Sequence, residues 1–108
     1  MSWITICEKS SLSPNTGVCA KLGEEQVAIF WESLNDTLYA VSNYDPIGDA
    51  NVLSRGMIGS LGDALVVASP LYKQHFDLRT GKCIEAPENQ LKTWQVREDQ
   101  GLVQLLAA

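Results

Sequence analysis

The chain has 108 residues, of which 45% are hydrophobic, so its length suits one domain over residues 1–108 with a modest core. Its 13 acidic and 8 basic residues give a net charge of −5, which argues against a nucleic-acid backbone as partner, because proteins that bind one gather Lys and Arg against phosphates. No stretch approaches the ~20 apolar residues of a membrane span, and the N-terminus lacks the pattern of a signal peptide. We therefore expect a cytoplasmic protein.

Short β-branched and aromatic runs, separated by turn residues, predict strands along most of the chain. Four runs in the first half suggest a meander, over residues 2–7, 16–23, 25–31 and 37–43. A turn-rich segment follows over 44–56, and single helical turns fit 8–13 and 51–57. The second half predicts strands over 64–69, 75–78, 80–86, 91–98 and 102–106. This spacing predicts an all-β fold, either an antiparallel sandwich or a partly open barrel.

Cysteines and tryptophans are expected to serve packing. The cysteines are three in number, stand far apart and form no C-x-x-C pair, so a disulfide framework is not expected. We expect reduced, buried thiols at Cys7, Cys19 and Cys83. Aromatic residues of the core or of a sheet face are expected at Trp3, Trp31 and Trp94.

Two turn-rich segments have the pattern of a metal-binding loop pair. The first, SNYDPIGDANVLSRG, places Asn43, Pro46, Leu53 and Gly56 where a Rieske iron–sulfur domain has an N-x-C-P-H loop followed by Leu-x-x-Gly. The second, VASPLYKQHFDLRTGKC, follows the spacing of the other Rieske loop, in which Cys-Pro-x-His precedes an aromatic residue and a Thr-Gly turn. The chain therefore resembles a Rieske-type domain.

All four ligand positions depart from the Rieske pattern. The resemblance places Asp45 and Ile47 at the first Cys and His positions, and Ser69 and Tyr72 at the second pair. A Rieske cluster needs two thiolates on one iron and two imidazoles on the other. The chain has a single histidine, His75. We therefore expect no metal and no cofactor in this chain.

Nearly the whole chain is also similar to a narrower family, the small subunit of bacterial assimilatory NAD(P)H-dependent nitrite reductase. The likeness is carried, in order and spacing, by GVCAKLGEEQVAIF, SNYDPIGDANVLSRG and VASPLYKQHFDLRTGKC. It implies an accessory subunit in nitrate assimilation that has no catalytic residues of its own. It also implies a large partner subunit that holds FAD, siroheme and a 4Fe-4S cluster and reduces nitrite to ammonia with electrons from NADH or NADPH.

Two other functions stay open. One is a Rieske-like interaction module without a cluster, serving another redox enzyme or a regulatory partner. The other is an electron carrier with unusual ligands.

The two degenerate loops, residues 44–49 and 69–75, are the predicted partner-binding surface. Loops on a rigid β scaffold commonly carry recognition, and interface anchors are typically aromatic or apolar with a polar rim. Alternatively, the loops fold back on each other, with Ile47 and Tyr72 filling the volume that the cluster and its imidazoles would occupy. The candidate contact residues are Tyr44, Ile47, Leu71, Tyr72, Lys73 and His75.

Charged residues in the same region suggest further sites. Asp45 and Asp49 form a candidate acid–base pair, or a metal site with His75, although acidic residues in a Pro/Gly loop usually make local turns. A basic spot for an acidic partner or a phosphate is suggested by Arg55, Lys73 and Arg79.

Overall fold

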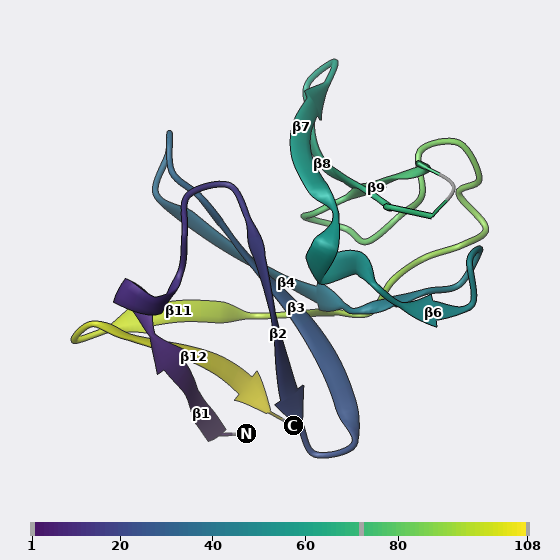
Figure 1. The fold of residues 1–108 in the computed structure, drawn as a ribbon. Coiled ribbons are helices and arrows are strands. Elements are labelled where there is room, and N and C mark those ends of the chain that lie inside the picture. Colours follow the sequence, from purple (N-terminus) through teal and green to yellow (C-terminus); the bar gives the residue numbers. More distant parts are fainter. Residues whose placement is uncertain (1, 72, 108) are drawn as a thin grey trace.

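We describe the chain from a computed structural model, which places residues 2–71 and 73–107. Figure 1 shows antiparallel strands throughout, and the described residues contain no α-helix. The all-β prediction is confirmed, and the sheets do not close into a barrel. No helix in this part of the chain has the length and apolar character needed to cross a bilayer. The elements are β1 (Ser2–Glu8), η1 (Lys9–Ser11), β2 (Gly17–Leu22), β3 (Glu25–Glu32), β4 (Thr37–Ser42), β5 (Tyr44–Asp45), β6 (Ala50–Asn51), η2 (Leu53–Arg55), β7 (Met57–Leu61), β8 (Ala64–Ala68), β9 (His75–Asp77), β10 (Thr93–Trp94), β11 (Val96–Asp99) and β12 (Leu102–Ala107).

The centre of the fold is a meander of β2, β3 and β4, in which each strand pairs antiparallel with the next. The predicted meander is thus confirmed for its second to fourth runs. It is wrong for the first run, because β1 pairs with β12, with Ser2 opposite Ala107. Strand β12 also pairs with β11, so these three strands form a separate sheet. Apolar side chains of this sheet, such as Ile6 and Leu105, cover one face of the meander, which explains why β1 leaves it.

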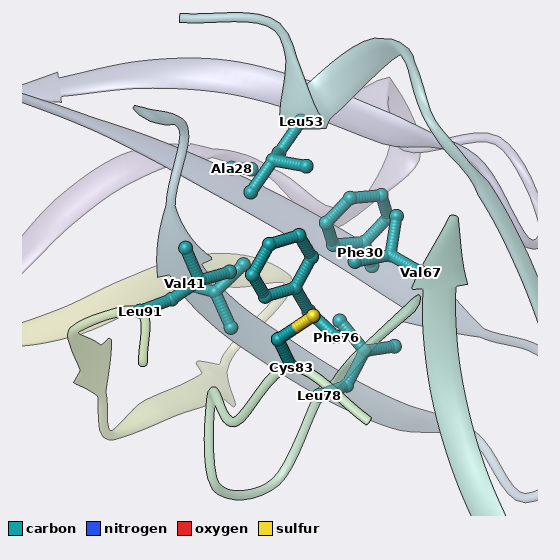
Figure 2. Packing of buried hydrophobic residues seen from close by; sticks show 9 residues of the cluster. All are labelled: Ala28, Phe30, Val41, Leu53, Val67, Phe76, Leu78, Cys83 and Leu91. Atoms are coloured by element: carbon teal, nitrogen blue, oxygen red, sulfur yellow. The ribbon is translucent and has the colours of Figure 1, made fainter. Parts of the chain in front are cut away.

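Strand β3 is buried on both faces and separates two hydrophobic cores. Successive side chains of a strand alternate, so Val27 and Ile29 enter one core while Ala28 and Phe30 enter the other. This double burial explains why residues 27–31 form a continuous apolar run. The sheet-side core contains Leu12, Val27, Ile29, Ala40, Val103 and Leu105. The loop-side core, shown in Figure 2, contains Ala28, Phe30, Val41, Leu53, Val67, Phe76, Leu78, Cys83 and Leu91.

A third sheet, in the order β7-β8-β9, includes one strand that the sequence did not indicate. Strand β7 contains Gly59 and Ser60, which disfavour a strand, and it is defined by its pairing with β8 in a hairpin that projects in Figure 1. The predicted strand over 80–86 is wrong, since the described residues form only isolated bridges there. The chain turns inward at Cys83, which is buried and donates its backbone N–H to the Asn89 carbonyl at 3.0 Å.

The predicted strand over 91–98 is divided between two sheets. Strand β10 pairs with β4, whereas β11 pairs with β12. Gln95 lies between them, and its carbonyl accepts a hydrogen bond from the Leu106 N–H at 3.0 Å. The change of sheet at Gln95 therefore connects the meander to the sheet formed by β1, β12 and β11.

The helical turns predicted at 8–13 and 51–57 are confirmed as the short 3-10 turns η1 and η2.

The packing residues largely lie as expected. Cys83 is buried, Cys7 is half-buried and all three thiols are free. The prediction is wrong for Cys19, which is exposed in β2, a strand at the edge of its sheet. Each tryptophan is half-buried beneath a cation. The pairs are Lys9 over Trp31, Lys92 over Trp94 and Arg97 over Trp3.

Candidate functional site

The two degenerate loops lie side by side, and we call them together the loop tip. The first loop, residues 44–49, is closed by the pairing of β5 with β6. The second loop, residues 69–75, joins β8 to β9, and its Tyr72 lies outside the described residues. A Cβ atom built on Gly48 would come within 2.5 Å of Leu71 Cδ1. Glycine at position 48 therefore lets the two loops pack against each other.

A hydrogen bond between Asp45 and Ser69 joins the loops. Both side chains are buried, with exposures of 0% and 1%. The Ser69 hydroxyl donates to Asp45 Oδ2, while Asp45 Oδ1 accepts from the backbone N–H groups of Ile47 at 2.9 Å and Gly48 at 3.0 Å. These three donors compensate the burial of a carboxylate, which would be costly if unpaired. The two positions that would carry the Rieske cysteines are thus linked without metal.

The second loop is closed by its own backbone. Ser69 donates its N–H to the Gln74 carbonyl at 2.8 Å, and its carbonyl accepts from the Lys73 N–H at 3.0 Å. Its hydroxyl also accepts from the Leu71 N–H at 3.3 Å. Lys73 has a φ of 61°, a left-handed conformation that is uncommon outside glycine. The loop therefore holds Lys73 in a defined conformation, with its side chain exposed.

The predicted contact residues differ in how much surface they offer. Tyr44, Leu71 and Lys73 are exposed, and His75 is half-buried. Ile47 is also half-buried and packs against the loop-side core. Among the described candidates, the exposed side chains are thus those of Tyr44, Leu71 and Lys73.

His75 is engaged by Glu85. The His75 Nδ1 atom lies 2.5 Å from Glu85 Oε2, and the His75 backbone N–H donates to Glu85 Oε1 at 2.8 Å. Burial opposes ionisation of Glu85, but these hydrogen bonds outweigh it and lower the pKa of this carboxyl to about 2. The imidazole therefore faces a carboxylate that stays ionised over almost the whole pH range.

The candidate acid–base pair of Asp45 and Asp49 does not form, because the two carboxylates have separate partners. Asp45 makes the local turn described above, and Asp49 accepts a hydrogen bond from the Tyr44 hydroxyl. That hydrogen bond, together with burial and the nearby negative charges, raises the pKa of Tyr44. Neither Asp45 nor Asp49 is paired with His75, as the suggested metal site would require, and the described residues contain no group of three His, Cys, Asp or Glu side chains able to hold a metal ion.

The side chains at the ligand positions do not fit a 2Fe-2S cluster. The described positions hold a carboxylate, an isoleucine and a hydroxyl, whereas the cluster requires thiolates and imidazoles. The thiols lie elsewhere: Cys83 is in the loop-side core, and Cys7 and Cys19 belong to β1 and β2. The hydrogen bond of Asp45 and the contact of Leu71 with Gly48 also bring together the loops between which a cluster would sit.

A groove of about 450 Å³ opens beside the second loop, and we call it the tip groove. Arg55 and Lys73 both line it, which confirms part of the predicted basic spot. Arg79 does not, because it lines a different pocket with Trp94. The tip groove has a mainly apolar floor, and its lining includes Arg55, Met57, Ala68, Pro70, Lys73 and His75.

Sequence reasoning missed two residues of this region, Glu85 and Met57. Glu85 is ten positions from His75 in a segment without regular structure, so no local pattern signals their pairing. Met57 begins the strand that the sequence did not indicate, and it is 78% exposed. A strand prediction at 57–61, paired with 64–68 in a hairpin, would have placed Met57 opposite Ala68 at the start of the second loop and given a signal for the groove.

Comparison with known proteins identifies relatives along nearly the whole chain. A family model described as a Rieske-like 2Fe-2S domain matches residues 2–106. The nitrite reductase (NADH) small subunit of Escherichia coli K12 is 47% identical over 103 residues, which cover 95% of each chain. The NMR structure of the E. coli protein NirD superposes with a TM-score of 0.88 at 46% identity, over 96% of this chain and 94% of that one. A third relative, the nitrite reductase NAD(P)H large subunit of Klebsiella oxytoca, is 40% identical over 101 residues, which are 94% of this chain and 10% of the relative.

The bond between Asp45 and Ser69 makes a testable contribution to stability. We expect Ser69→Ala to lower the free energy of unfolding by about 1–3 kcal/mol, because it leaves a buried carboxylate oxygen without its donor. Asp45→Asn should also lower the free energy of unfolding. The double variant should lose less stability than the sum of the two single losses, since either change alone breaks the bond. Urea unfolding measures all three, with the exposed Ser60→Ala as control. Additive losses would show that the two side chains act independently.

Glu85 should make stability depend on pH. Its folded-state pKa of about 2 lies below its ordinary 4.5, so its ionised form stabilises the fold above pH 4.5, and this contribution is lost as the pH falls toward 2. Glu85→Gln cannot ionise, so the gap in unfolding free energy between wild type and variant should shrink over that range. Chemical unfolding at several pH values measures the gap, and the exposed Glu88→Gln variant is the control. A constant gap would contradict this expectation.

The donor set also predicts the metal content. Purified anaerobically, the isolated chain should lack stoichiometric iron, acid-labile sulfide and visible absorbance, because the described ligand positions offer no thiolate or imidazole. A chelator should leave its amide NMR spectrum dispersed and unchanged. Iron and sulfide in amounts expected for one cluster per chain would overturn the donor-set argument.

Proposed function

The chain belongs to the Rieske-like family and, within it, to the small subunits of nitrite reductase, and we propose that it is the accessory small subunit of a cytoplasmic NAD(P)H-dependent nitrite reductase. The observation that carries this proposal is the 47% identity to a nitrite reductase small subunit over 95% of both chains. The whole chain, residues 1–108, would act as one Rieske-like domain.

The partner is the large subunit of the enzyme. In K. oxytoca a segment similar to 94% of this chain makes up 10% of a single polypeptide named as the large subunit. In that organism the segment similar to this chain and the rest of the large subunit are covalently joined, so they are held close to each other. This arrangement supports direct binding of the separate small chain to a large chain.

Reduction of nitrite to ammonia takes place on the large subunit in this proposal. FAD, siroheme and a 4Fe-4S cluster of that subunit carry electrons from NADH or NADPH, in the service of nitrate assimilation. In this proposal the small chain contributes no cofactor and no catalytic residue. The hydrogen bond between Asp45 and Ser69, at the positions of the cysteine ligands, supports the absence of a cluster. Its contribution is binding.

The proposed partner-binding surface is the loop tip. Exposed Tyr44 and Leu71 supply aromatic and apolar area, and Lys73 supplies charge. The internal hydrogen bonds of both loops reduce the entropy that binding would cost, because the surface is already ordered. The residues proposed to contact the large subunit are Tyr44, Ile47, Leu71, Tyr72, Lys73 and His75.

Co-purification with the large subunit tests the proposal. The two chains, expressed together with an affinity handle on the large one, should elute as one complex. Nitrite-dependent NAD(P)H oxidation should be higher with the small chain than without it, because binding of the accessory chain is expected to support the activity of the large subunit. The small chain alone is the control and should be inactive. An active large subunit that neither binds nor responds to this chain would overturn the proposal in favour of another redox enzyme or a regulatory partner.

A further inference from the structure

We propose that the tip groove is the docking site for an acidic segment of the large nitrite reductase chain. An apolar side chain of that segment lies on the floor beside Met57 and Pro70, and its carboxylates face Arg55 and Lys73. This inference rests on the proposed function and adds the surface and the chemistry of the contact. It also brings in Arg55 and Met57, which lie outside the loops predicted from sequence.

The floor of the groove is apolar and exposed to solvent. Met57 is 78% exposed although methionine is among the residues most often buried, and Pro70 is exposed beside it. Leu71, the next residue of the second loop, is exposed as well. Methionine is flexible and polarisable, so it adapts to the shape of a partner side chain. An apolar anchor residue in a groove of this kind is a common source of binding energy.

The rim of the groove is positive on a protein whose net charge is −5. Within the described residues, Lys9, Lys92 and Arg97 each have a carboxylate partner, whereas Arg55 and Lys73 have none, and neither have Lys21, Arg79 and Lys82 outside the groove. The groove lining contains no Asp or Glu. Of the carboxylates around it, Glu85 is paired with His75, and Asp45 is bonded to the buried Ser69 hydroxyl.

Two unneutralised cations therefore remain at the rim. Complementary charge across an interface gives selectivity and speeds association. The segment of the large subunit that binds this positive rim is therefore acidic.

Both walls of the groove are held by the fold. Arg55 ends η2, whose residues Leu53 and Ser54 donate backbone N–H groups to the Asn43 backbone carbonyl at 3.0 Å and to its side-chain oxygen at 2.7 Å. A Cβ atom on Gly56 would come within 2.4 Å of the Ala68 carbonyl, so this wall lies directly against β8. Lys73 is held by the closed second loop. The backbone positions of the two cations are thus fixed by the fold, so a partner has only their side chains to order.

The test measures affinity of the small chain for the purified large subunit by calorimetry, over a series of salt concentrations. We expect Met57→Asp, and separately the double variant Arg55→Glu/Lys73→Glu, to weaken binding about tenfold or more. Wild-type affinity should fall as salt rises, and that dependence should be lost or inverted in the charge-reversed variant.

Matched controls carry the same changes outside the groove. Leu34→Asp replaces a leucine that is 88% exposed in the turn after β3, and Lys21→Glu/Lys82→Glu changes the net charge by the same amount. Both should bind within about twofold of wild type. Circular dichroism and thermal unfolding establish that each variant is folded. If a groove variant unfolds, Met57→Ala and Lys73→Gln remove the anchor and the charge more gently and should still weaken binding.

The outcomes separate this inference from the proposed function. Failure of the wild-type chain to bind the large subunit would overturn the proposed function, and the inference with it. Normal binding by folded groove variants would overturn the inference alone and leave the proposed function standing. Sedimentation of the small chain by itself tests a different occupant. If the wild-type chain self-associates and Met57→Asp abolishes this, the groove binds a second copy of the chain and the proposal is overturned.

Discussion

The buried carboxylate of Asp45 is the constraint on which the loop tip depends. Its two oxygens accept from the Ser69 hydroxyl and from two backbone N–H groups of its own loop, so both loops must adopt one arrangement for the charge to be compensated. In a Rieske domain, coordination of one iron by two cysteine thiolates imposes a comparable requirement on the same two positions. Loss of the metal ligands therefore need not loosen the loops, because a charge-assisted hydrogen bond supplies the cross-link.

The scaffold sets the position of the tip through a second buried polar group, Asn43. Its side chain donates to Gln26 in β3 at 3.1 Å and accepts from the Ser54 N–H, and its backbone bonds both segments as well. A Cβ on Gly17 of β2 would lie 2.5 Å from the Ser54 carbonyl, so η2 sits directly on the meander. Because β3 is packed on both faces, η2 rests on the most enclosed part of the chain. The shape of the tip groove is therefore determined by the central sheet as much as by its own residues.

The sequence predicted those strands and loops whose conformation is determined by residues close together in the chain. The strands of the meander and the turn-rich loops follow from apolar runs and from Gly, Pro and Asp. The family resemblance placed Asp45 and Ser69 at the two cysteine positions of a Rieske site. Pairing between distant segments had no such signal, so the partner of β1 and the bond between His75 and Glu85 were missed. Strand β7 was missed because Gly59 and Ser60 are poor strand formers, and its formation depends on β8. The groove needs η2, β7 and the second loop at once, and so it could be found only in three dimensions.

The antiparallel pairing of β1 with β12 has a consequence for how this unit is joined to other polypeptides. It brings Ser2 opposite Ala107, and Figure 1 shows both ends together on the side of the molecule away from the β7–β8 hairpin. A linker attached at either end therefore leaves from the same place and does not cross the opposite side. Tethering of this kind raises the effective concentration of a binding surface without altering it. In the K. oxytoca relative a segment 40% identical to this chain is part of a longer polypeptide, and a tether of that kind changes the entropy of assembly without requiring a different fold.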